Sequence, residues 1–269
     1  MTMVIFDIDG VIRDVGGSYR RALADTVEHF TQGKYRPTPE DIDRLKEEGK
    51  WNNDWEASQE LIDRYSQSQP PAIPKGNPDS SPITYPKIVQ FFQSRYRGPD
   101  PENWDGYICS EPLLVEPAYL ESLTQAGIKW GFFSGATRGS AEFILTKRLG
   151  LSSPVLVAME DAPGKPDPTG LFQTVKLLEA QTPNLTSNLT PNLEPVIYLG
   201  DTVADMYTVN QARQQQPART WIGVGILPPH VQTTPASSQT YAQTLETAGA
   251  AIVLENMQKL TPDIIQSLV

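Results

Sequence analysis

The stretch "MVIFDIDGVIRD", from Met3 to Asp14, begins with a short, continuous apolar run and then places two aspartates and a glycine close behind it. A fully apolar run of this length, rich in β-branched residues, is typical of a parallel strand buried on both of its faces. Two carboxylates at the end of such a strand contribute nothing to core packing. They indicate that this strand end carries chemistry.

The composition is that of an ordinary globular protein, and a chain of 269 residues can bury a substantial core. A formal net charge of −10 argues against electrostatic binding to nucleic acid or to an anionic membrane. The single cysteine, Cys109, cannot form an internal disulfide, and with His29 and His230 it offers little for a zinc site. Since no apolar stretch approaches the roughly 20 residues of a membrane span, we expect a soluble, cytoplasmic protein.

Helical spacing dominates the chain after the first strand, and strand-like runs return only after about residue 116. Helices are predicted over residues 19–30, 38–49, 55–66 and 85–96. Later, apolar runs at 128–134, 154–159, 195–200 and 220–225 alternate with helical patterns. Such alternation is typical of right-handed β-α-β crossovers and a parallel sheet. We therefore predict an α/β, Rossmann-like core built from residues 1–14 and 116–269, with a mainly α-helical domain, residues 15–115, inserted after the first strand.

Polar residues follow the ends of four predicted strands. Asp7 and Asp9 follow the first and Ser134 ends the second. Lys165 stands in "GKPDPTG" after the third, and Asp201 and Asp205 stand in "GDTVADM" after the fourth. Ligands of open parallel sheets bind beyond the carboxyl ends of the strands. We therefore expect these side chains to converge although they are far apart in the sequence.

In this order, "DIDGV", Ser134, Lys165 and "GDTVADM" resemble the four motifs of the haloacid dehalogenase (HAD) superfamily. The branch resembled carries a helical C1 cap inserted just after the first motif and includes phosphoglycolate phosphatases and β-phosphoglucomutases. The resemblance covers the core from Met3 to about Met206 and is only architectural in the inserted domain. It implies a HAD-like hydrolase that transfers a phosphoryl group through an aspartyl-phosphate.

The chemistry of the acidic residues agrees with the roles that the resemblance implies. Asp7 fits the nucleophile, and Asp9 fits the general acid that protonates the leaving alcohol and later activates water. Because side chains alternate along an extended segment, both should point the same way. Oxygens of Asp7, Asp201 and the backbone carbonyl of Asp9 suit Mg²⁺, the expected cofactor. Asp205 would bind the metal or orient one of its waters.

A phosphoryl group among these carboxylates requires compensating positive charge and hydrogen-bond donors. Lys165 supplies the charge, while the Ser134 hydroxyl and nearby backbone N–H groups, including that of Gly135, can hold phosphoryl oxygens. Arg13 follows the first motif closely and is a candidate for binding a second anionic group, although it could equally be a solvated helix charge.

The stretch "KWNNDWEAS" in the inserted domain holds candidates for substrate selection. Trp51 and Asn52 could provide an apolar wall and hydrogen bonds to a leaving group. Trp51 and Trp55 are also one helical turn apart, so they could instead pack the core of the inserted domain.

These observations predict a Mg²⁺-dependent phosphatase of a small phosphorylated metabolite, a sugar phosphate or a phospho-acid. A sugar phosphomutase is the alternative, because "DGVI" resembles the first motif of both classes, although "RDVGGSYRRA" departs from the mutase pattern. Asp9 disfavours a dehalogenase, which needs no acid there. A non-catalytic binding protein is less compatible with a full set of catalytic side chains. The sequence specifies neither the substrate nor the oligomeric state.

Overall fold

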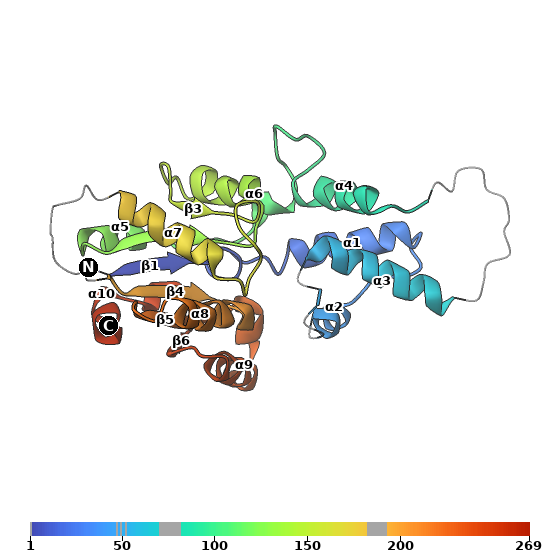
Figure 1. Ribbon diagram of the computed structural model, residues 1–269. Helices are drawn as coiled ribbons and strands as arrows, with labels where there is room; N and C mark the ends of the chain where they lie inside the picture. Colours follow the sequence, from blue (N-terminus) through green and yellow to red (C-terminus); the bar gives the residue numbers. More distant parts are fainter. Residues whose placement is uncertain (1, 47, 49, 52, 70–81, 182–192) are drawn as a thin grey trace. The chain divides into compact units, whose positions relative to one another are not determined.

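The computed structural model describes residues 2–46, 48, 50–51, 53–69, 82–181 and 193–269. The contacts divide the chain into two compact units (Figure 1). The core unit comprises Met1–Asp14 and Pro112–Val269, and the helical unit comprises Val15–Glu111. The proline-rich segment 70–81 and the three Thr-x-Asn-Leu repeats of 182–193, both loop-like in composition, lie almost wholly outside the described residues.

Within the described residues, the core unit contains one parallel sheet with the strand order β3-β2-β1-β4-β5-β6. Its strands are β1 (Met3–Phe6), β2 (Lys129–Phe133), β3 (Leu156–Val157), β4 (Val196–Gly200), β5 (Trp221–Ile226) and β6 (Ile252–Leu254). Strand β1 lies between β2 and β4, with Phe6 paired to Phe132 on one side and to Leu199 on the other. All four residues of β1 are buried, as its continuous apolar sequence predicts.

Helices of the core unit follow its strands. They are α5 (Pro117–Gln125), α6 (Arg138–Glu142) with the π-helical turn η2 (Phe143–Arg148), α7 (Thr169–Ala180), α8 (Val203–Gln215), α9 (Pro235–Thr247) and α10 (Pro262–Leu268), together with the short 3₁₀ helices η3 (Pro229–Thr233) and η4 (Met257–Lys259). Gly127 ends the segment of α5 with a φ of +73°, a conformation that favours glycine. Met3 and Ile5 of β1 pack in one cluster with Leu171 of α7 and Val209 of α8, which fixes the centre of the sheet.

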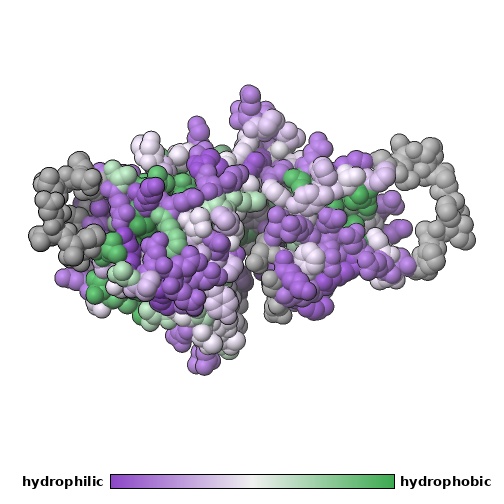
Figure 2. Space-filling model, in the orientation of Figure 1, coloured by the Kyte–Doolittle hydropathy of each residue, from purple (hydrophilic) through white to green (hydrophobic). Residues whose placement is uncertain are grey.

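The helical unit consists of α1 (Tyr19–Phe30), α2 (Pro39–Lys46), α3 (Asp54–Ser68), α4 (Tyr85–Tyr96) and the 3₁₀ helix η1 (Tyr107–Ser110). Helix α1 packs against both α3 and α4. Leu23, Ile62 and Phe92 are buried between them. The side chain of Asn53 caps α3, accepting a hydrogen bond from the backbone N–H of Trp55 at 2.9 Å. Hydrophilic residues dominate the surface of this unit in the view of Figure 2.

The predicted helices and strands are largely where the sequence places them. The sequence pattern did not reveal β6, α9 and α10, and the third strand is only two residues long. In the part of the chain that the structure describes, no helix has both the length and the apolar character needed to cross a membrane.

Candidate active site

The candidate site lies at the carboxyl end of the central strands of the core unit. Asp7 follows β1 directly, and its backbone N–H donates to the carbonyl of Leu199 on β4 at 2.9 Å. Asp201 follows β4 directly, and Ser134 follows β2. Because β1 pairs with both of these strands, the three strand ends are neighbours. The predicted convergence of strand-end side chains is therefore found for this part of the set.

Asp7 is held in a fixed orientation at the centre of the site. Its side chain is buried, with one carboxylate oxygen accepting the backbone N–H of Ile8 at 2.7 Å and the other lying 2.9 Å from the ammonium of Lys165. Burial raises the pKa of Asp7 to about 7, against the attraction of Lys165 and with help from the nearby Asp205 and Asp9 carboxylates. The ionised form of Asp7 is therefore disfavoured in this environment unless a cation binds beside it.

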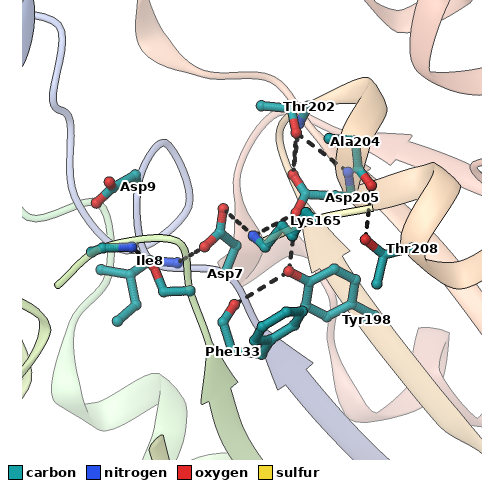
Figure 3. Close-up of polar contacts among 12 residues, drawn as sticks. Asp7, Ile8, Asp9, Phe133, Lys165, Tyr198, Thr202, Ala204, Asp205 and Thr208 are labelled. Carbon is teal, nitrogen blue, oxygen red and sulfur yellow. Dashed lines mark hydrogen bonds and ion pairs between the residues drawn. The ribbon is translucent and has the colours of Figure 1, made fainter. Parts of the chain in front are cut away.

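Lys165 joins two carboxylates of the cluster. Its ammonium nitrogen lies 2.9 Å from Oδ2 of Asp7 and 2.6 Å from Oδ1 of Asp205 (Figure 3). Burial opposes the charge on Lys165, but the two carboxylates outweigh that cost and raise its pKa above the ordinary value. The lysine is therefore a permanent positive charge within the acidic cluster.

Asp201 depends on the glycine of the first motif. Gly10 has a φ of +74°, and a Cβ built on it would lie only 2.0 Å from Oδ2 of Asp201. Glycine is thus required twice at this position, for the backbone conformation and for the close approach of the carboxylate. The hydroxyl of Tyr241, on α9, donates to the backbone carbonyl of Asp201 at 2.8 Å. Burial and the neighbouring Asp205 and Asp7 raise the pKa of Asp201 well above its ordinary value.

Asp205 is fully buried in the first turn of α8. It forms a capping box with Thr202: the Asp205 carboxylate accepts the Thr202 backbone N–H at 3.0 Å, and the Thr202 hydroxyl accepts the Asp205 N–H at 3.3 Å. The hydroxyl of Tyr198 lies 3.0 Å from the other carboxylate oxygen of Asp205. The sequence pattern T-x-x-D at residues 202–205 signals this capping box, whereas nothing in the sequence singles out Tyr198.

Carboxylate oxygens of Asp7, Asp201 and Asp205 gather at one place, where a divalent cation bound by some of them would offset their charge. One carboxylate oxygen from each of the three lies within 4.8 Å of the others. All are hard oxygen donors, and Lys165 alone cannot balance three carboxylates. The raised pKa values of Asp7 and Asp201 express this excess of negative charge. The donor set therefore suits Mg²⁺, the expected metal.

Asp9 does not point the same way as Asp7, contrary to the expectation from strand alternation. The chain leaves β1 after Phe6 and bends at Ile8, so the segment is not extended there. Figure 3 shows Asp9 beside the cluster formed by Asp7, Lys165 and Asp205 rather than within it. The Oδ1 atom of Asp9 accepts a hydrogen bond from Nε of Arg13 at 2.7 Å and lies 2.6 Å from Nη2 of the same guanidinium.

Arg13 therefore differs from the expectation that it binds an anionic group of the substrate or is a solvated helix charge. Its side chain is completely buried, and its guanidinium pairs with Asp9. A guanidinium enclosed in this way is not presented to a ligand. The physical reason is that Arg13 belongs to the turn after β1, where its backbone carbonyl accepts the N–H of Gly10 at 2.9 Å.

Ser134 and Gly135 begin the loop after β2. The Ser134 side chain is buried, and its oxygen accepts the backbone N–H of Ala136 at 3.1 Å, which leaves the hydroxyl hydrogen available for donation. Gly135 is exposed, and no atom lies within 4 Å of the position that its Cβ would occupy. This loop can therefore admit a ligand close to its backbone.

The candidates from the helical unit are Trp51 and Asn52, and this unit can be described only by itself. Trp51 is half-buried within its own unit, where the indole N–H donates to Glu48 at 3.0 Å. That bond and the guanidinium of Arg64 lower the pKa of Glu48 to about 2, with Arg64 contributing most. Asn52 lies outside the described residues.

Comparisons with known proteins agree with the geometry of the core. The fold is similar to that of a hydrolase from Pseudomonas syringae (18% identity, all of both chains covered, TM-score 0.61). It is also similar to the phosphatase Tt82 from Thermococcus thioreducens (23% identity, 83% of this chain and 93% of the other, TM-score 0.60) and to a β-phosphoglucomutase from Clostridium difficile (15% identity, 99% and 96%, TM-score 0.57).

A curated relative, the imidazoleglycerol-phosphate dehydratase of Phytophthora nicotianae, is 28% identical over 256 residues, which are 93% of this chain. The chain spans about half of that relative, 49% of its length. The model of the haloacid dehalogenase-like hydrolases matches residues 1–213, which include every strand-end residue described above. The chain is a member of the haloacid dehalogenase-like hydrolase family.

Proposed function

We propose that this hydrolase is a Mg²⁺-dependent phosphatase that cleaves a small phosphate monoester through an aspartyl-phosphate on Asp7. The observation that carries the proposal is the setting of Asp7: a buried carboxylate at the end of the central strand, fixed by the Ile8 N–H and Lys165 within a cluster of oxygen donors. A carboxylate attacks phosphorus well when positive charge offsets the repulsion between the two anions.

In the first step a carboxylate oxygen of Asp7 attacks phosphorus, the bond from phosphorus to the leaving oxygen breaks, and Asp9 donates a proton to that oxygen. In the second step Asp9 takes a proton from water, whose oxygen attacks phosphorus, and the bond from phosphorus to Asp7 breaks. Asp7, Asp201 and the backbone carbonyl of Asp9 would hold Mg²⁺, which screens the phosphoryl charge. Lys165, the Ser134 hydroxyl and the backbone of Gly135 would bind the phosphoryl oxygens.

For this reaction Asp9 has to leave its present contact with Arg13 or turn its second oxygen towards the leaving group. Turning the second oxygen keeps the pair with the buried Arg13, and side-chain rotations of exposed residues take only picoseconds to nanoseconds. With 30% of its side chain exposed, Asp9 has room for it.

The curated relative from Phytophthora nicotianae, of which this chain covers about half, suggests a narrower class of substrate to test. The matched half of the Phytophthora nicotianae relative aligns with a hydrolase-family chain, whereas its name describes a dehydratase acting on imidazoleglycerol phosphate. Because that name puts an imidazole-bearing phosphate ester beside a hydrolase-like stretch of chain, phosphate monoesters that carry an imidazole ring are proposed as the first substrates to test. The helical unit is proposed to select among them, with Trp51 and Asn52 as candidates.

The test is phosphate release from a panel of imidazole-bearing monoesters, sugar phosphates and phospho-acids, with Mg²⁺ and with excess chelator. Metal-dependent release is expected, and Asp7→Asn should abolish it while the thermal melt stays cooperative. Rapid acid quenching followed by mass spectrometry should find a phosphoryl group on the tryptic peptide that contains Asp7. Isomerised sugar phosphates without net phosphate release would instead favour the phosphomutase alternative. An Asp7→Asn variant with normal release contradicts the mechanism.

A further inference from the structure

The carboxylate of Asp205 is already saturated with protein donors. Its Oδ1 lies 2.6 Å from the Lys165 ammonium and 3.0 Å from the Tyr198 hydroxyl. Its Oδ2 accepts the backbone N–H and the hydroxyl of Thr202, at 3.0 and 2.6 Å. Two carboxylate oxygens offer about four acceptor positions, and these four contacts use them. Asp205 is therefore better suited to holding Lys165 in place than to coordinating a metal ion directly.

The hydroxyl of Tyr198 is the donor to Asp205 that core packing does not require. Tyr198 lies on β4 and is completely buried, so a phenylalanine would fill the same apolar space. Its hydroxyl lies within hydrogen-bond distance of the Asp205 carboxylate and, at 3.2 Å, of the backbone carbonyl of Phe133, the last residue of β2 (Figure 3). One hydroxyl hydrogen serves one acceptor at a time, and the carboxylate is the stronger of the two.

Lys165 depends on this network because no regular element fixes it. It stands in the loop before α7, and its ammonium is located by Asp7, by Asp205 and by the faces of the Phe133 and Tyr198 rings, each 5.4 Å from the nitrogen to the ring centroid. If Asp205 turned away, the remaining carboxylate partner within this cluster would be Asp7. Lys165 would then be drawn towards the nucleophile and away from the phosphoryl position.

We propose that Tyr198 is a positioning residue for Lys165 that acts through Asp205. This inference rests on the proposed function, because it takes Lys165 as the cation that binds the phosphoryl group. The hydroxyl donates to Oδ1 of Asp205 and keeps that oxygen directed at the ammonium. The part of the site affected is phosphate binding and not the metal.

The decisive variant is Tyr198→Phe, which removes one hydroxyl and keeps the ring. Tyr119→Phe is the matched control, because the Tyr119 hydroxyl also donates to one backbone carbonyl of the core unit, that of Leu260 at 2.9 Å, but is not part of the cluster. Thr202→Val, which removes a donor from the other oxygen of Asp205, is the second variant and keeps the proposal testable should Tyr198→Phe fail to fold.

Inhibition by inorganic phosphate, the Mg²⁺ concentration for half-maximal thermal stabilisation, KM and kcat are measured for each protein. Tyr198→Phe should weaken phosphate inhibition and raise KM about 10-fold to 100-fold, the loss expected for one hydrogen bond to a charged group, with the Mg²⁺ response within about twofold of the wild type. Thr202→Val should act in the same direction, and Tyr119→Phe should leave all four quantities unchanged.

Unchanged phosphate inhibition in folded Tyr198→Phe overturns the inference. So does an equal loss of Mg²⁺ response, which would place the effect at the metal. A wild type that neither hydrolyses the panel nor binds phosphate is a separate result: it contradicts the proposed function itself and removes the role of Lys165 on which the inference depends.

Discussion

Gly10→Ala tests how closely the first motif and Asp201 fit together. Gly10 has a φ of +74°, and a Cβ there would lie 2.0 Å from Oδ2 and 2.4 Å from Cγ of Asp201. Real Cβ atoms essentially never lie nearer than 3.0 Å to a neighbouring heavy atom, so the Asp201 carboxylate must shift by about 1 Å. Metal sites tolerate about 0.2 Å in ligand distances, so a shift of this size removes Asp201 as a ligand.

Gly127→Ala is the control for the backbone part of this change. Gly127 has nearly the same φ, +73°, but no atom lies within 4 Å of its missing Cβ. A left-handed conformation costs a residue with a Cβ about 1–2 kcal/mol, and that cost applies to both variants. For a domain of this size it lowers Tm by roughly 2–8 °C. Any further loss in Gly10→Ala reports on the displacement of Asp201.

The assay is a thermal melt of each variant over a Mg²⁺ titration, together with phosphate release. Gly127→Ala should lose a few degrees of Tm but keep the Mg²⁺ response and the activity of the wild type. Gly10→Ala should need about 10-fold to 100-fold more Mg²⁺ for the same stabilisation, and its kcat should fall about 100-fold, the usual cost of a 1 Å misplacement. Equal Mg²⁺ responses and equal kcat values in the two variants would refute the reasoning, because displacing the Asp201 carboxylate would then affect neither metal binding nor catalysis.

Two further predictions concern Asp7 and the partner of Asp9. Burial raises the pKa of Asp7 from 3.8 to about 7. Between these pH values the folded protein keeps a proton on Asp7 that the unfolded chain releases. The stability that this proton contributes is therefore lost as the pH rises. In chelator-treated protein, Tm of the wild type should therefore fall relative to Asp7→Asn between about pH 4 and pH 7; a constant difference between the two melting curves argues against it. Arg13→Lys keeps the charge but cannot keep both contacts to Asp9, so kcat/KM for esters of alcohols should fall about tenfold or more, while p-nitrophenyl phosphate, whose leaving group needs little protonation, should be hydrolysed nearly as well. An equal loss on both substrates would mean that Arg13 acts on the fold and not on Asp9.

The sequence predicts most of the architecture, because the spacing of its apolar residues differs between buried strands and helices that face solvent on one side. The continuous apolar runs of β1, β4 and β5 reflect strands buried on both faces, and the helical spacing of α1 and α4 ends where the structure ends these helices. The strand that was missed is β6, whose run Ile252–Leu254 is apolar but only three residues long. It is partly buried at the edge of the sheet, and so short an apolar run does not distinguish a strand from a loop or a helix end.

The candidate site was only partly predictable, since strand-end positions follow from the pattern but side-chain directions do not. Asp7, Asp201 and Lys165 gather as their places after the strands suggest, because pairing with β1 brings those ends together. Asp9 is turned aside by a bend at Ile8 that no residue type announces, and the same turn encloses Arg13, whose charge would ordinarily indicate a surface position. The burial of Arg13 beside the proposed general acid is thus apparent only once the backbone path is known. Its guanidinium is placed to orient Asp9 and not to bind a ligand.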